Sequence, residues 1–128
     1  MEGKMIQLDN KCGKPIYEQI IEQIKVDIMK GYLVRGDIIP SVRRLALQLS
    51  ITPSTVAKAY QELERQGIIE TIIGKGTFIA SDLVFKVDEQ KLVGIEEKLF
   101  QQILSYKMMG FSKEDVVKRV KEMYDSIG

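Results

Sequence analysis

Two helix starts that lie close together in the middle of the chain restrict its fold more than any other feature. Pro40-Ser41 and Thr52-Pro53 each pair a proline with a hydroxyl side chain that can cap the first turn of a helix. Apolar residues at helical spacing follow both starts, as far as Ser50 in the first segment and Gly67 in the second. Two short helices joined by a very short turn are typical of a helix-turn-helix.

The same part of the chain has no acidic residue between Asp37 and Glu62, although the sequence holds 18 Asp and Glu residues in total. A surface that contacts phosphate must keep carboxylates away, because like charges repel. Each polar side chain in this window could be only a helix cap or a solvated charge, but together their spacing predicts contact with DNA. The candidate DNA-binding side chains are Ser41, Arg43, Arg44, Thr52, Ser54, Thr55 and Lys58.

The second predicted helix is expected to place its first turn at the DNA, where free backbone N–H groups and the positive end of the helix dipole favour phosphate. From there, Ser54, Thr55 and Lys58 are expected to reach base edges or phosphate oxygens. Arg43 and Arg44 occupy adjacent helical positions, which point about 100° apart, so at most one of them is expected to face DNA squarely. Arg43 is the first choice, because it lies two positions after the predicted cap.

A β-hairpin is predicted directly after the second of these helices. Strand-forming residues at 68–73 and 77–79 flank a turn made of Gly74-Lys75-Gly76. A hairpin in this position is a wing, and its tip, including Thr77, is expected to enter the minor groove or lie on the phosphates. The alternative is an ordinary tight turn. The pattern does not fit a nucleotide-binding loop, because that loop leads into a helix and here a strand follows.

Helical patterns also occur at both ends of the chain. One helix is predicted over residues 15–31, and two more follow a junction at Ser81-Asp82, separated by Gly110, with Ser112 as the cap of the last. The two late helices carry more apolar surface than they can bury against each other, so we expect a symmetric dimer. Alternatively, they fold back onto the core of residues 1–80. The predicted dimer interface consists of Leu92, Ile95, Leu99, Ile103, Val116, Val120 and Met123.

These elements predict a mainly α fold with a small β-hairpin, of the α+β class. Residues 1–80 are expected to form a winged helix-turn-helix DNA-binding domain. Residues 81–128 are expected to form a short two-helix dimerisation region.

The composition argues against an enzyme. The chain has no histidine, and its single cysteine, Cys12, cannot form an internal disulfide or a thiolate metal cluster. No cofactor or metal is therefore expected. No apolar run approaches the roughly 20 residues of a membrane span, and no signal-peptide core follows the N-terminus, which indicates a cytoplasmic protein. The net charge of +1 says little about partners, because the position of the charges matters more than their sum.

Three motifs stand out in the chain: Pro40-Ser41-Val42-Arg43-Arg44-Leu45-Ala46, Thr55-Val56-Ala57-Lys58-Ala59-Tyr60-Gln61-Glu62-Leu63-Glu64 and Gly74-Lys75-Gly76-Thr77-Phe78. Together they resemble the GntR family of bacterial transcription regulators. Pro15-Ile16-Tyr17-Glu18-Gln19-Ile20 is also similar to the family's opening helix. Residues 81–128 are too few for the large effector domain that most members carry, so the chain looks like the small YtrA-type branch.

The resemblance implies a homodimer that binds a two-fold symmetric operator, usually as a repressor and often of a transporter operon. It also implies that Arg43 contacts phosphate or a base, that Thr55 is the recognition-helix hydroxyl, and that Gly74 is the wing-tip glycine. Two positions depart from the family. Pro53 replaces an arginine that many members use to contact a base, and Arg35-Gly36 replaces the usual Pro-Gly, so that Arg35 could add a phosphate contact.

The sequence thus predicts a sequence-specific DNA-binding transcriptional regulator without enzymatic activity. Two other functions stay open, a winged-helix module that binds a partner protein and a sensor of small molecules. Binding to DNA should weaken steeply with salt, whereas docking of the same helix on a protein should depend little on salt. The sequence does not define the operator, the sign of regulation or an effector.

Overall fold

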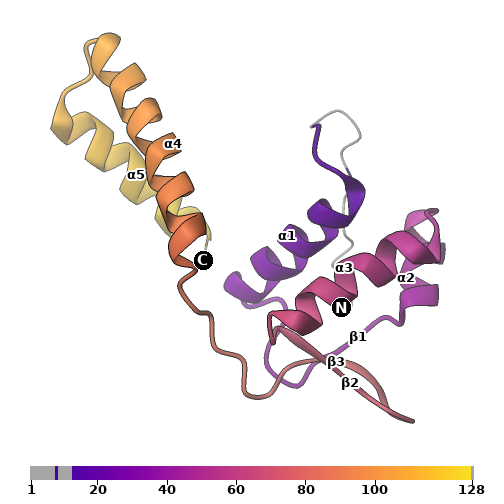
Figure 1. Ribbon diagram of the computed structural model, residues 1–128. Helices are drawn as coiled ribbons and strands as arrows, with labels where there is room; N and C mark the ends of the chain where they lie inside the picture. The colour runs from indigo at the N-terminus through magenta and orange to yellow at the C-terminus, as the bar shows by residue number, and fades with distance from the viewer. Residues whose placement is uncertain (1–7, 9–12, 128) are drawn as a thin grey trace. The chain divides into compact units, whose positions relative to one another are not determined.

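The computed structural model of the protein describes Leu8 and residues 13–127, so Cys12 and most of the predicted polar lead lie outside the described residues. The chain forms two compact units, the first ending at Val84 and the second beginning at Phe85 (Figure 1). No helix in the described part of the chain is long and apolar enough to cross a membrane. The helices are α1 (Ile16–Met29), α2 (Val42–Leu49) and α3 (Pro53–Arg65) in the first unit, and α4 (Glu89–Met108) and α5 (Lys113–Ile127) in the second.

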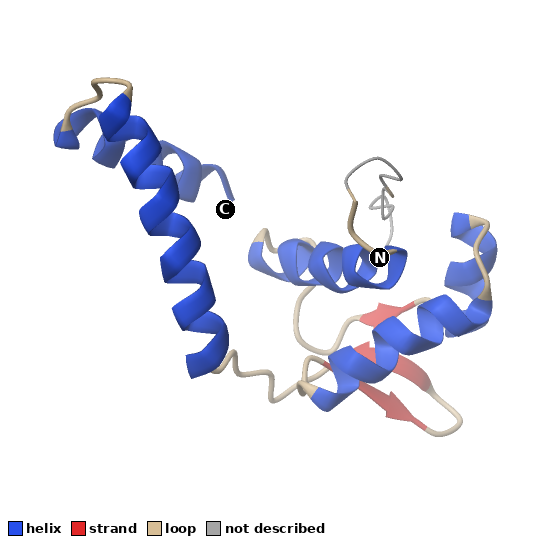
Figure 2. Ribbon diagram, turned by 45° about the horizontal axis from the view of Figure 1, so that its top comes forward, coloured by secondary structure: helices blue, strands red, loops and turns tan. Residues whose placement is uncertain are grey.

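The first unit is built around α3, which packs against both α1 and α2 and also contacts the sheet (Figure 2). Its three predicted helices are confirmed, because each buries the apolar stripe that defined it in the sequence. The core therefore holds α2 and α3 as a fixed pair on the scaffold of α1. The helical core residues are Ile20, Ile21, Ile24, Leu45, Ala46, Val56, Ala59, Tyr60 and Leu63.

The predicted hairpin is confirmed, and it is part of a larger sheet. Strands β2 (Ile69–Ile72) and β3 (Gly76–Ile79) pair antiparallel, with Ile69 opposite Ile79. A third strand, β1 (Ile38–Ile39), pairs with the other edge of β3, which gives the order β1-β3-β2. No strand was predicted at these two residues, because β1 exists only through its pairing with β3, far along the chain.

The second unit is a pair of helices joined by a turn at Gly110. Asp88 caps α4 by accepting a hydrogen bond of 3.1 Å from the Lys91 amide, and Ser112 caps α5 in the same way for the Asp115 amide, as predicted. In the turn, the rings of Tyr106 and Phe111 meet edge to face with their centroids 5.3 Å apart.

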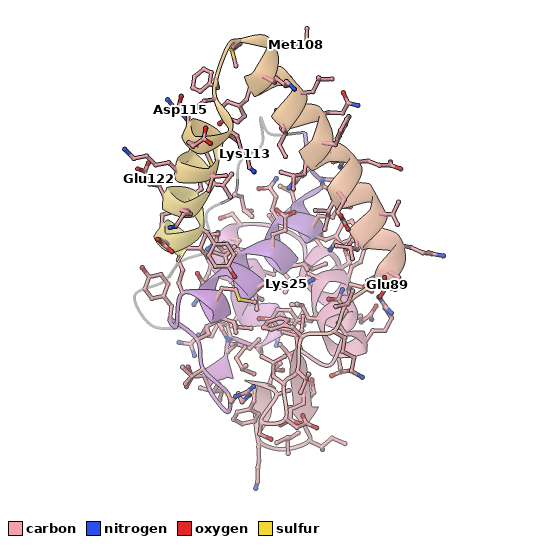
Figure 3. The ribbon with its side chains drawn as sticks, turned by 90° about the vertical axis from the view of Figure 1, so that its left-hand side faces the viewer. Lys25, Glu89, Met108, Lys113, Asp115 and Glu122 are labelled. Carbon is pink, nitrogen blue, oxygen red and sulfur yellow. The ribbon has the colours of Figure 1, made fainter. Side chains whose placement is uncertain are left out.

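This helical pair has no core of its own. Not one described residue of α4 or α5 is buried, although both helices carry apolar stripes. Charged side chains such as Lys113, Asp115 and Glu122 project from α5, and Met108 is exposed where α4 ends (Figure 3). The helices α4 and α5 therefore do not bury these apolar stripes against each other.

Candidate nucleic-acid interface

The turn between α2 and α3 is tight because local hydrogen bonds and one unusual backbone angle define it. Ser41 caps α2 as predicted, since its Oγ accepts a hydrogen bond of 3.2 Å from the Arg44 amide. At the other end, Ser50 adopts a left-handed conformation with φ of 56°. The Ile51 amide then donates back to the Ala46 carbonyl at 3.0 Å, which closes the helix end. The chain can therefore start α3 almost immediately.

Thr52 occupies the cap position of α3, but its side chain does not cap the helix. Its Oγ1 lies 3.1 Å from the Ser54 hydroxyl and 2.9 Å from the Thr55 hydroxyl. The prediction of a side-chain cap is wrong here, because the Thr52 hydroxyl forms hydrogen bonds with these neighbouring hydroxyls and not with a backbone amide. The result is a small cluster of hydroxyls at the first turn of α3, in which Thr52 and Ser54 are exposed and Thr55 is half-buried.

The outward face of α3 follows from its buried face. Positions Val56, Ala59, Tyr60 and Leu63 are buried, so the opposite side of the helix carries Ser54, Lys58 and Gln61, which are all exposed. These three are four and seven positions apart, which places them on one stripe. We call this stripe the outward face. The sequence interpretation missed Gln61, although its spacing from Ser54 and Lys58 could have identified it.

Lys58 has a partner inside the protein. Its Nζ lies 3.9 Å from the centroid of the Tyr17 ring on α1, a cation–π contact. The ammonium group is therefore held toward α1 at the edge of the outward face. The side chains of Ser54 and Gln61 are uncharged, so the rest of the outward face is neutral and polar.

Arg43 and Arg44 are both exposed in the first turn of α2. Among the described residues, neither guanidinium forms an ion pair with a carboxylate. Both arginines are thus available to an anionic ligand. They add to the positive charge that Lys58 brings to the outward face of α3.

The wing tip projects beyond the sheet with little side-chain bulk. Gly74 and Gly76 have φ of 81° and 126°, which other residues rarely adopt, and the Lys75 amide closes the turn on the Ile72 carbonyl at 2.9 Å. Lys75 is exposed, and Ile73 beside it is 97% exposed, an apolar tip that the sequence interpretation did not single out. Lysine and isoleucine therefore share the end of the hairpin.

Thr77 does not belong to this exposed tip. Its side chain is only 9% exposed in β3, where the backbone pairs with Ile39 on one side and Thr71 on the other. A DNA contact at Thr77 stays a prediction, and its side chain is far less accessible than those of the exposed tip. Residue type could not reveal the difference, because alternate positions of a strand point to opposite faces and only the strand register decides which.

Arg35 also has a partner within the protein. Its Nη2 donates a hydrogen bond of 2.8 Å to the carbonyl oxygen of Leu83. The guanidinium that the sequence assigned to phosphate is thus used, at least in part, to hold the end of the first unit.

Glu62 marks the end of the acid-free window, and its charge is held by neighbours. Arg65 forms a two-fold contact with the carboxylate through Nε and Nη2, and Gln66 donates to it at 2.9 Å. Hydrogen bonds from Arg65 and then Gln66 lower the pKa of Glu62 from 4.5 to about 2. The last acidic side chain beside the outward face is therefore ionised and paired.

The predicted interface residues of the second unit are all at the surface of one chain. Leu99 is 50% exposed, Ile95 52% and Met123 56%. Leu92, Ile103 and Val120 are exposed to a similar degree, and Val116 is half-buried. No group of potential metal ligands lies together in the described part of the chain.

Comparison with known proteins gives consistent matches over most of the chain. The sequence model described as bacterial regulatory proteins, gntR family, matches residues 16–79. The chain is 44% identical over 119 residues to the HTH-type transcriptional repressor YtrA of Bacillus subtilis, a match that covers 93% of this chain and 92% of that protein.

The fold of the chain is also similar to those of solved structures. A crystal structure named as a transcriptional antiterminator from Listeria monocytogenes EGD-e has a TM-score of 0.77 and 40% identity, and the match covers 97% of this chain and 92% of that one. The DNA-binding domain of AraR, solved in complex with its operator ORX1, has a TM-score of 0.52 and 28% identity over 58% of this chain and 93% of its own.

Proposed function

The chain belongs to the gntR family of bacterial regulatory proteins and is a DNA-binding transcriptional regulator rather than an enzyme, and we propose that it is a homodimeric repressor of a two-fold symmetric operator. We expect it to act in the cytoplasm, where bacterial DNA lies. The observation that carries the proposal is the exposed outward face of α3, together with Arg43 and Arg44 of α2, which form no ion pair with the described carboxylates.

Each part of this surface suits a different component of DNA. Ser54 and Gln61 are neutral hydrogen-bonding side chains, and an amide such as that of Gln61 can bond adenine through two atoms in the major groove. Arg43 and Arg44 suit phosphates or guanine, and we keep Arg43 as the first choice. Lys75 at the wing tip suits the minor groove or its phosphates. Specific contacts thus come from α3, and charge comes from α2 and the wing.

The second unit supports the dimer. A helical pair with apolar stripes and no buried residue gains stability when a second copy covers it. We propose that Leu92, Ile95, Leu99 and Ile103 of α4 and the stripe of α5 make this contact. Two copies can then place two recognition helices in successive major grooves, about one helical turn apart.

The test is DNA binding by the full chain at several salt concentrations, with a duplex that the protein itself selects from a random library. We expect Arg43→Ala to weaken binding and to make the slope of log K against log salt shallower by about 0.9, because one phosphate contact is lost. Lys30→Ala removes an exposed cation at the end of α1 and is the matched control. Unchanged affinity and slope for Arg43→Ala, or equal effects of both variants, would contradict the assigned surface.

A further inference from the structure

One contact closes the first unit at the point where the chain leaves it. The guanidinium of Arg35, in the loop between α1 and β1, donates its 2.8 Å hydrogen bond to the Leu83 carbonyl, 48 positions later in the sequence. Leu83 is itself anchored, since its side chain is only 3% exposed. It is the last buried residue in the described part of the chain. We call this contact the Arg35–Leu83 latch.

The loop that carries Arg35 is fixed to the sheet on its own side. The Gly36 amide donates to the Ile79 carbonyl at 2.8 Å, and the Ile79 amide donates back to the Asp37 carbonyl at 2.8 Å. The Asp37 carboxylate also accepts from the Val34 amide at 2.8 Å. These hydrogen bonds fix the backbone of the loop that carries Arg35. The hydrogen bond from Arg35 can therefore restrain the position of Leu83.

Beyond the latch, the chain has no comparable anchor before α4. Val84, Phe85 and Val87 are 64%, 45% and 70% exposed, and residues 84–88 form neither helix nor strand. The two compact units separate after Val84, one residue past the latch. The latch thus marks the start of the linker between the DNA-binding unit and the helical unit.

From this position we propose that Arg35 is a positioning residue that fixes where the linker begins and thereby limits the half-site spacing that the dimer accepts. The inference rests on the proposed function, because spacing has meaning only for a dimer on a two-part operator. With the latch gone, only the buried side chain of Leu83 retains residues 81–83, and its release adds them to the linker. An extended chain spans about 3.3–3.6 Å per residue, so each copy gains roughly 10 Å of reach, or about three base-pair steps.

The other role for Arg35 is the phosphate contact that the sequence suggested, and the two roles predict different measurements. A lost phosphate contact lowers affinity at every spacing and makes the salt slope shallower by about 0.9. A lost latch leaves the salt slope unchanged and widens the range of spacings that bind. Hence spacing and salt dependence, measured on one variant, distinguish them.

The experiment is selection by the full chain from a DNA library with two fixed half-sites and a spacer of variable length. We expect the wild type to enrich one narrow spacing, Arg35→Ala to enrich spacers several base pairs wider and narrower, and Lys30→Ala, which removes a cation before the same loop, to behave as the wild type. A narrow, unchanged spacing for Arg35→Ala overturns the latch, as does a uniform loss of affinity with a shallower salt slope. If the wild type enriches no paired half-sites at all, it is the proposed dimeric function that fails.

Discussion

The hydroxyl of Tyr60 on α3 donates a hydrogen bond of 2.7 Å to the carbonyl oxygen of Pro40, the residue before the cap of α2. Tyr60 is 6% exposed, and burial raises the pKa of its phenol, so the hydroxyl stays protonated and remains a donor. This bond ties the recognition helix to the start of its partner helix. It thereby helps to fix the angle between α3 and α2.

Removal of this hydroxyl should destabilise the first unit. In Tyr60→Phe the Pro40 carbonyl loses its partner in a mostly buried place, which costs about 1–2 kcal/mol. For a unit of this size the melting temperature should fall by about 4–8 °C per kcal/mol. Thermal unfolding followed by circular dichroism checks this.

Tyr124→Phe is the matched control, because Tyr124 on α5 is 77% exposed and should tolerate the change without a shift. Equal melting temperatures for the wild type and Tyr60→Phe would show that the bond contributes nothing to stability.

Gln61 should act on specificity rather than on general affinity. Its amide is exposed on the outward face, the surface that we propose meets the bases, and it carries no charge. We expect Gln61→Ala to cost about 1–3 kcal/mol on the selected site and to leave non-specific binding and its salt slope unchanged. Fluorescence anisotropy with a selected and a scrambled duplex measures both.

Gln101→Ala, an exposed amide on α4, controls for loss of an amide elsewhere. If Gln61→Ala lowered the affinity for the selected and the scrambled duplex by the same factor, Gln61 would instead contact the DNA backbone.

The Glu62 carboxylate predicts a pH dependence of stability. Its pKa is lower in the folded protein, about 2 against an ordinary 4.5, so its contribution is fully present above about pH 4.5 and is lost as the pH falls toward 2. The wild type should therefore be more stable than Glu62→Gln at pH 7, and the difference should mostly vanish by about pH 2. Urea unfolding at both pH values measures it. A difference that stays constant with pH would contradict the assigned pairing with Arg65.

A charge in the apolar stripe of α4 should separate the dimer. Leu99 is half-exposed in one chain, and in the dimer a carboxylate there would be buried without a partner. We expect Leu99→Glu to reduce the mass in light scattering from twice the 14.6 kDa of one chain to that of a single chain. Gln101→Glu adds the same charge at an exposed polar position and should stay dimeric. A wild type that scatters as one chain at micromolar concentration would exclude this interface.

Most of the fold could be predicted from local signals. Ser41 and Ser112 mark helix starts, and buried positions such as Val56 and Leu63 follow the helical period. The strand β1 could not be predicted, because two isoleucines are too few to show the alternating pattern of a strand. They form a strand only by pairing with β3.

The candidate site was predictable in its location and less so in its side chains. The acid-free window indicated α2 and α3, and the Gly74-Lys75-Gly76 turn between two strand patterns indicated the wing. The partners of Arg35 and Lys58, at Leu83 and Tyr17, are distant in the sequence, so no local pattern could indicate them. The same holds for Thr77, whose burial depends on the register of the whole sheet.

The measurement that tests the central claim most directly is sequencing of the genomic fragments that the purified full chain retains. A dimeric repressor that reads DNA with α3 and the wing should enrich a two-fold symmetric site, with half-site centres about 34–36 Å apart or a multiple of that distance. The enrichment should disappear for Arg43→Ala combined with Gln61→Ala. No enriched motif, a single asymmetric half-site, or an unchanged motif for the double variant would contradict it.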